Sequence, residues 1–204
     1  MHLNVPFVLA SASPRRRELL RSIGLSFSIE ISGIDETDIC GRETPNEVVE
    51  CLALAKANDI AKRFPDALVL GADTIVALDE EILGKPNDPA EAALMLGKLS
   101  GRSNTVFSAV ALVHRVSGRC FVGHERTRVT FSDLTEQEID SYVASGAPMD
   151  KAGAYGIQGD LGALFISGVE GDYFNVVGLP LHRMYQMMRR HFSDFIDFSA
   201  NRNQ

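Results

Sequence analysis

Residues 7–23 read FVLASASPRRRELLRSI. The short apolar run at 7–10 predicts a buried strand. A helix follows it: Ser13 is a suitable N-cap, because its hydroxyl can accept a bond from a free backbone N–H, and Pro14 fits the first helical position. Leucines and an isoleucine then recur at helical spacing, at positions 19, 20 and 23. The stretch therefore predicts the strand–loop–helix unit that opens an α/β fold.

Three arginines crowd the first turn of this predicted helix: Arg15, Arg16 and Arg17. The helix dipole is positive there, so each exposed cation costs about 0.3–1 kcal/mol. An anion would offset this cost, because free N–H groups and guanidinium groups that converge on one point form a phosphate site. The alternative is a solvated basic turn whose arginines reach neighbouring carboxylates.

The rest of the chain alternates between predicted strands and helices. We expect strands at 27–31, 67–71, 74–78, 105–115, 120–131 and 163–169, the fourth and fifth joined as a hairpin. We expect helices at 45–63 and 89–99, from 135 onward, and within 175–190. On helix 45–63, Val48, Leu52, Ala55 and Ile60 are expected to face inward. This mixture predicts an α/β fold with helices flanking a mixed, twisted sheet.

Composition excludes several classes of protein. The formal net charge of −7 argues against a general nucleic-acid binder, which depends on neutralising phosphates. No apolar run approaches the roughly 18 residues that a membrane span needs. Cys40, Cys51 and Cys120 are widely spaced without a C-x-x-C, which disfavours disulfides and zinc and fits a reducing cytosol. We see no signal peptide, so we expect a cytoplasmic protein without nucleic-acid or membrane partners.

Acidic residues follow two of the predicted strands. Asp73 comes after LVLG, and in open α/β sheets ligands bind at the carboxyl ends of strands. Gly71 would let a ligand approach, so Asp73 is a candidate general base or metal ligand; the alternative is an Asp that caps a turn beside Thr74. The loop after the predicted strand 27–31 holds Asp35, Glu36 and Asp38. Such carboxylates suit Mg²⁺ or Mn²⁺, although loops are commonly acidic.

Two lysines and a glutamine complete the candidate set. Lys56 lies on helix 45–63, where a solvated face is the simpler explanation. Lys85, in the LGKP turn, could neutralise a phosphate or be a plain surface lysine. Gln158 lies in the glycine-rich segment DKAGAYGIQGDLGALF, whose glycines let the backbone approach a ligand. Its amide can read the edge of a base; the alternative is a flexible, turn-rich connection.

Eight segments, in this order, resemble the motifs of the Maf family of nucleotide pyrophosphatases: SASPRRRELL, DET, ALAKA, GADTIV, LGKP, LSGR, DKAGAYGIQG and GDYFNVVGLPL. They span nearly all of residues 7–190. The resemblance implies one α/β domain over 1–192, with two lobes around a nucleotide-binding cleft, and we expect a frayed tail at 193–204. It also implies hydrolysis of a nucleoside triphosphate to a monophosphate and pyrophosphate with a divalent metal, often as a homodimer. The residues of the last two motifs are similar to those of the family branch that acts on dTTP and UTP. This similarity implies a house-cleaning role that keeps non-standard nucleotides out of nucleic acids.

The resemblance also implies roles for individual residues. It matches Asp73 to the family's proton acceptor, and Glu36, Lys56 and Lys85 to cleft residues implicated in metal or phosphate handling. Together with the phosphate site expected at the start of helix 14–23, this predicts catalytic roles for Asp73, Lys56 and Lys85; substrate binding by Ser13, Arg15, Arg16, Thr74 and Gln158; and metal binding by Glu36 and Asp73. Arg15, Thr74 and Gln158 match positions linked to base selection. Two alternatives stay open: a nucleotide-binding regulator of cell division with little turnover, and a nucleotidyl or phosphoryl transferase with a second substrate.

Overall fold

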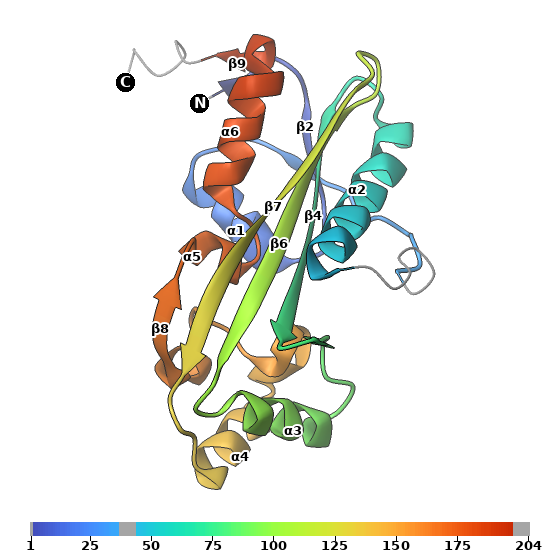
Figure 1. The fold of residues 1–204 in the computed structure, drawn as a ribbon. Coiled ribbons are helices and arrows are strands. Elements are labelled where there is room, and N and C mark those ends of the chain that lie inside the picture. The colour runs from blue at the N-terminus through green and yellow to red at the C-terminus, as the bar shows by residue number, and fades with distance from the viewer. Residues whose placement is uncertain (1, 37–43, 198–204) are drawn as a thin grey trace. The chain divides into compact units, whose positions relative to one another are not determined.

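Figure 1 shows a computed structural model, which describes residues 2–36 and 44–197 of the chain. The chain divides into two compact units. Unit 1 comprises Met1–Asp73, Ser108–Glu125 and Gly178–Gln204, and unit 2 comprises Thr74–Phe107 and Arg126–Val177. Most strands follow the order β3-β2-β4-β6-β7-β8 in one sheet, with β5 on β4, and both parallel and antiparallel pairs occur. The predicted mixed sheet with flanking helices is therefore confirmed.

Unit 1 begins with the predicted strand–loop–helix. Strand β2 (Phe7–Ala10) is wholly buried, and helix α1 (Pro14–Ser22) follows it with Ser13 as N-cap. Strand β3 (Ser28–Ile29) is shorter than the predicted 27–31 and pairs in parallel with β2. Helix α2 (Pro45–Arg63) then leads to β4 (Leu68–Leu78), which pairs in parallel with the other edge of β2. Helix α6 (Leu181–His191) completes the unit, and Figure 1 shows α2 and α6 on opposite sides of its strands.

Helix α2 packs on β4 through small residues. Its buried side is formed by Val49, Leu52, Ala53, Ala57, Ile60 and Ala61, so the expectation that Val48 and Ala55 face inward is wrong; both are only partly buried. A Cβ added to Gly71 of β4 would lie 2.1 Å from the Ala53 carbonyl oxygen and 2.8 Å from the Ala57 nitrogen. Gly71 therefore admits the backbone of α2, and its predicted role of admitting a ligand is wrong.

Strand β4 does not stop before Asp73. The sequence predicts separate strands at 67–71 and 74–78, but the structure has one strand of 11 residues, buried except at the half-buried Thr74. Asp73 thus lies within β4, and the prediction that it ends a strand is wrong. The parallel pairing of β2 with β4 ends at Ala10 opposite Gly71, so Asp73 lies just past the carboxyl end of β2.

Unit 2 contains the remaining core. Strand β5 (Glu81–Leu83) pairs antiparallel with the end of β4. Helix α3 (Pro89–Leu99) has the predicted bounds, and Asp88 is its N-cap. Strands β6 (Ser103–His114) and β7 (Arg119–Phe131) continue from one unit into the other. Helix α4 (Glu136–Ala144) confirms the helix predicted from 135 onward and begins with a capping box between Thr135 and Glu138.

Short 3-10 turns follow α4: η1 (Ala147–Asp150), η2 (Ala152–Ala154) and η3 (Leu161–Phe165). Strand β8 (Ile166–Glu170) starts later than the predicted 163, because Asp160 caps η3 through the Gly162 N–H. The predicted last helix is two helices, α5 (Tyr173–Val177) and α6, separated by Gly178 with a φ of 117°. Within 2–36 and 44–197, no helix has the length and apolarity to cross a bilayer.

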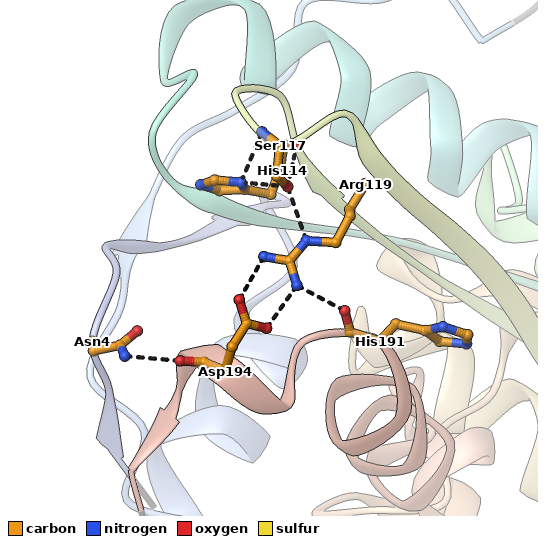
Figure 2. Close-up of polar contacts among 6 residues, drawn as sticks. All are labelled: Asn4, His114, Ser117, Arg119, His191 and Asp194. Atoms are coloured by element: carbon orange, nitrogen blue, oxygen red, sulfur yellow. Dashed lines mark hydrogen bonds and ion pairs between the residues drawn. The ribbon is translucent and has the colours of Figure 1, made fainter.

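The chain after α6 is anchored to unit 1 as far as residue 197 (Figure 2). Turn η4 (Ser193–Phe195) leads to β9 (Ile196–Asp197), which pairs antiparallel with β1 (His2–Leu3). The Arg119 guanidinium donates to both Asp194 carboxylate oxygens, at 2.7 and 3.0 Å, and lies 4.2 Å over the Phe195 ring. The expectation of a frayed tail from 193 is therefore wrong for 193–197, and 198–204 lie outside the described residues.

Candidate functional site

The first turn of α1 has the predicted cap but an unexpected arginine. The Ser13 hydroxyl accepts a bond from the Arg16 N–H at 3.5 Å. The Arg16 guanidinium turns inward, with 9% of the residue exposed, and donates to the carbonyl oxygens of Gly178 at 2.8 Å and Ala72 at 2.9 Å and to the Ser11 hydroxyl at 3.1 Å. Burial lowers its pKa, and the Asp73 charge opposes this shift.

These hydrogen bonds stabilise Arg16 in the first turn of α1 without requiring a bound anion. Its guanidinium joins the loop after β2, the residue before Asp73 in β4 and the residue that opens the segment leading to α6. The role of Arg16 in phosphate binding stays a prediction. Arg15, on the same turn, is only half-buried.

Three predicted residues meet around one ammonium group. The Lys56 Nζ lies 2.6 Å from Asp73 Oδ1 and 2.9 Å from Glu36 Oε1. Lys56 comes from α2, Asp73 from β4, and Glu36 from the segment after β3, all within unit 1. The side chains of Lys56 and Asp73 are only 13% and 11% exposed, so the simpler explanation of Lys56 as part of a solvated helix face is wrong.

The close packing of α2 on β4 makes this cluster possible. Ala53 and Ala57 lie against Gly71, and Lys56 is the neighbour of Ala57 on that helix. Any larger residue at 71 would separate the helix from the strand and increase the distance between the Lys56 ammonium and the Asp73 carboxylate. The lysine holds two carboxylates near one another, because its positive charge offsets their mutual repulsion.

The donor set fits a hard divalent cation. Mg²⁺ is commonly held by one or two carboxylates, with the remaining ligands coming from substrate phosphates and water. Asp73 and Glu36 both contact the Lys56 ammonium, so two carboxylates of this kind belong to one charged cluster. Over the described part of the chain, no group of three or more His, Cys, Asp or Glu residues is placed to hold a metal by itself. Thr37 and Asp38 of the acidic loop lie outside the described residues.

The other predicted residues lie in unit 2. Thr74 follows Asp73 in β4 and is half-buried. Lys85 is exposed in the turn after β5, and Gln158 is exposed within the glycine-rich segment. This segment and the Lys85 turn are neighbours, because the Gly153 N–H donates to the Gly84 carbonyl oxygen at 2.9 Å.

Most glycines of the segment serve the protein's own packing. A Cβ on Gly153 would lie 3.1 Å from the Val76 side chain, and one on Gly156 would lie 2.7 Å from Lys151 Cε. A Cβ on Gly162 would lie 2.6 Å from the Tyr142 hydroxyl. Gly159 differs: it has a φ of 78° and open space around it. The expectation that the glycines admit a ligand is therefore wrong at Gly153, Gly156 and Gly162, where the glycine makes room for side chains of unit 2 itself.

Residues 6–191 match the family model described as Maf-like protein. The chain belongs to this family. A protein of Moorella thermoacetica named "dTTP/UTP pyrophosphatase" is 56% identical over 181 residues, which cover 89% of this chain and 92% of that protein. A protein of Salinibacter ruber with the same name is 46% identical over 200 residues, 98% of each chain. A crystal structure described as a nucleoside-triphosphatase / dITP/XTP pyrophosphatase from Mycobacterium abscessus aligns with a TM-score of 0.45 and 18% identity, over 97% of this chain and all of that one.

Two residues of this Maf-like chain that contact the glycine-rich segment have no signal of their own in the sequence. Tyr142 is fully buried in the core of unit 2, and Asp160 lies two residues after Gln158. Their side chains are hydrogen-bonded at 3.0 Å. Nothing in the local pattern links them, since Tyr142 is an ordinary apolar-face position of α4. The glycines at 156 and 162 were the available signal, because each is required by close contact with this group.

Proposed function

We propose that this Maf-like protein is a nucleoside triphosphate pyrophosphatase that converts dTTP and UTP to their monophosphates and pyrophosphate. Relatives at 46–56% identity over most of the chain carry the name dTTP/UTP pyrophosphatase. The observation that carries the proposal for this chain is the contact of Lys56 with both Asp73 and Glu36, which assembles a charged cluster from three motifs of the family. We propose a house-cleaning role that keeps non-standard pyrimidine nucleotides out of nucleic acids.

Asp73 is the general base in this proposal. Its carboxylate takes a proton from a water molecule that attacks the α-phosphorus; the bond from that phosphorus to the bridging oxygen then breaks and pyrophosphate leaves. Lys56 holds the Asp73 carboxylate at 2.6 Å and fixes its orientation. Arg16 fixes the backbone beside it through the Ala72 carbonyl. A positioned base of this kind contributes about 10²–10⁴-fold to the rate.

The triphosphate requires cationic partners. We assign Arg15, Arg16 and Lys85 to the phosphates, together with the N–H groups that Ser13 helps to orient at the start of α1. Asp73 and Glu36 would hold a divalent cation, Mg²⁺ or Mn²⁺, which neutralises phosphate charge when bound. The pair of carboxylates around Lys56 supports this assignment, because oxygen ligands suit these ions.

Gln158, with Thr74 and Arg15, is assigned to base selection. Thymine and uracil present an acceptor–donor–acceptor edge, and a Gln amide can satisfy two of these groups. A cytosine or purine would leave a polar group unpaired, and this cost disfavours the wrong base. The exposure of Gln158 on its loop leaves its amide available to a ligand.

Pyrophosphate release from dTTP, UTP, dCTP, dATP and dGTP, measured with Mg²⁺ or Mn²⁺, tests the proposal. We expect selective release from dTTP and UTP. Asp73→Asn should lower kcat by about 10²–10⁴-fold without unfolding the protein. Asp66→Asn, an exposed carboxylate of the same unit just before β4, is the matched control and should leave kcat unchanged.

Each failure has its own meaning. Near-normal turnover in Asp73→Asn would remove Asp73 from the role of base. Tight nucleotide binding with no pyrophosphate release by the natural chain would replace the enzyme with a nucleotide-binding regulator. Equal rates on all five nucleotides would retain the hydrolytic chemistry and remove the selection assigned to Gln158.

A further inference from the structure

Residues 156–160, which we name the Gln158 loop, are hydrogen-bonded at both ends to the Tyr142 hydroxyl. At one end, the Gly156 N–H donates to the Tyr142 hydroxyl oxygen at 3.3 Å. At the other end, the Tyr142 hydroxyl donates to Asp160 Oδ1 at 3.0 Å. Gln158 lies midway between these attachments. The same hydroxyl therefore sets the separation of the two ends of the loop.

Tyr142 is a fixed support for this loop. It is fully buried, and its ring packs edge-to-face on Phe165 with ring centroids 5.4 Å apart. Burial, with the nearby Asp160 charge, raises the pKa of Tyr142 above its ordinary value. The hydroxyl therefore keeps its proton at physiological pH, donates that proton to Asp160, and keeps a lone pair for the Gly156 N–H.

Asp160 ties the loop to further parts of unit 2. Besides Tyr142, its Oδ1 accepts from the Gly162 N–H at 3.0 Å, and its Oδ2 lies 3.2 Å from the Lys151 Nζ. The side chains of Lys151 and Asp160 are only 11% and 18% exposed. Lys151 also donates to the Ala147 carbonyl oxygen of η1. A largely buried carboxylate with three donors is held in one position, since moving it would break several charge-assisted bonds together.

The surroundings leave little room for movement. A Cβ on Gly156 would lie 2.7 Å from Lys151 Cε and 3.3 Å from Asp160 Oδ2. A Cβ on Gly162 would lie 2.6 Å from the Tyr142 hydroxyl and 2.9 Å from Asp160 Oδ1. The backbone on both sides of the Gln158 loop thus contacts the polar group that holds it.

We propose that Tyr142, acting with Asp160, is a positioning residue that sets the base selectivity of the enzyme by holding the Gln158 loop. This inference rests on the proposed function, in which Gln158 reads the base. A side chain that discriminates by hydrogen bonds must be held close to its productive geometry, because small displacements weaken the correct pair more than they weaken binding of the phosphates. Tyr142 itself does not contact the nucleotide in this proposal.

Tyr142→Phe removes only the hydroxyl and keeps the packed ring. The measured quantity is the ratio of kcat/KM for dTTP to kcat/KM for dCTP, well below the melting temperature of every variant. We expect this ratio to fall about tenfold in Tyr142→Phe, since the hydrogen bonds that orient the loop are lost. In a Gln158→Ala background, Tyr142→Phe should cause no further fall, because residues that act through one another are not additive.

Tyr155→Phe is the matched control. Tyr155 is also buried in unit 2 and also packs edge-to-face on a phenylalanine, but its hydroxyl donates to Asn104 of β6 at 2.9 Å. Tyr155→Phe should lower the melting temperature without changing the ratio of kcat/KM for dTTP to kcat/KM for dCTP. If Tyr142→Phe does not fold, Asp160→Asn replaces it, because it removes the charge that pairs with Lys151 and should also lower the ratio.

Two results would overturn the inference. One is an unchanged ratio in the folded Tyr142 or Asp160 variant. The other is an equal fall of the ratio with and without Gln158, which would show that Tyr142 does not act through that residue. A natural chain that releases no pyrophosphate, or that lacks base preference, is detected before any variant is made and counts against the proposed function instead.

Discussion

Replacing Arg16 by methionine separates the two explanations for the arginines of α1. Methionine keeps the length of the side chain and removes the guanidinium. If Arg16 is mainly a phosphate ligand, the free protein should lose little stability. If its inward contacts with Ser11, Ala72 and Gly178 are what hold it in the first turn, the free protein should be strongly destabilised.

The structure sets the size of the effect. Three hydrogen bonds from a charged donor are lost, at about 1.5–3 kcal/mol each. The substitution also removes the cost of keeping a charged guanidinium out of water, which offsets several kcal/mol of this loss. The net loss in the free energy of unfolding is therefore about 3 kcal/mol, which for a chain of this length lowers the melting temperature by about 6–12 °C.

Urea unfolding followed by circular dichroism, without nucleotide, measures this loss. Arg15→Met is the matched control: Arg15 is the neighbouring arginine of the same turn but is only half-buried. It should change the free energy of unfolding by less than about 1 kcal/mol, and it should raise the KM for the nucleotide. A loss below about 1 kcal/mol in Arg16→Met, or a larger loss in Arg15→Met, would refute the structural role of Arg16.

Two further predictions concern unit 1. Gly71→Ala should destabilise the protein by about 1–3 kcal/mol and lower kcat, because the added methyl would force α2 away from β4 and Lys56 away from Asp73. Thermal unfolding and turnover measure the two effects. Gly33→Ala, at an open position, is the control and should change neither. Arg119→Ala should destabilise the protein at pH 7, and this difference from the natural chain should shrink as the pH falls below about 4. Hydrogen bonding to Arg119 lowers the pKa of Asp194, so the stabilisation is present above the unfolded-state pKa and is lost as the carboxylate gains a proton. Urea unfolding of Arg119→Ala and the natural chain at pH 7 and pH 3 measures the difference in their free energies of unfolding. A difference that grows toward low pH would show that the Asp194 carboxylate is not stabilised by Arg119.

The sequence alone determined the features that depend on residues close together in the chain. The caps at Ser13, Asp88 and Thr135 and the first positions of their helices follow from side chains within one turn of the atoms they satisfy. The order of the motifs also determined the family, because eight short segments in a fixed order are far more specific than any one of them.

Tertiary structure decided what those residues contact. Arg16 turns inward because carbonyl groups from β4 and from residue 178 lie there, and nothing in SPRRR indicates this. Asp73 lies within a strand because residues 68–72 and 75–78 on either side of it are buried together, so the break expected between strands 67–71 and 74–78 does not form. Gly71, Gly156 and Gly162 are needed for contacts with residues up to 20 positions away, although their sequence pattern is equally typical of ligand loops. Local hydrogen bonding is set by nearest neighbours in the chain, whereas packing is set by whichever segments the fold brings together.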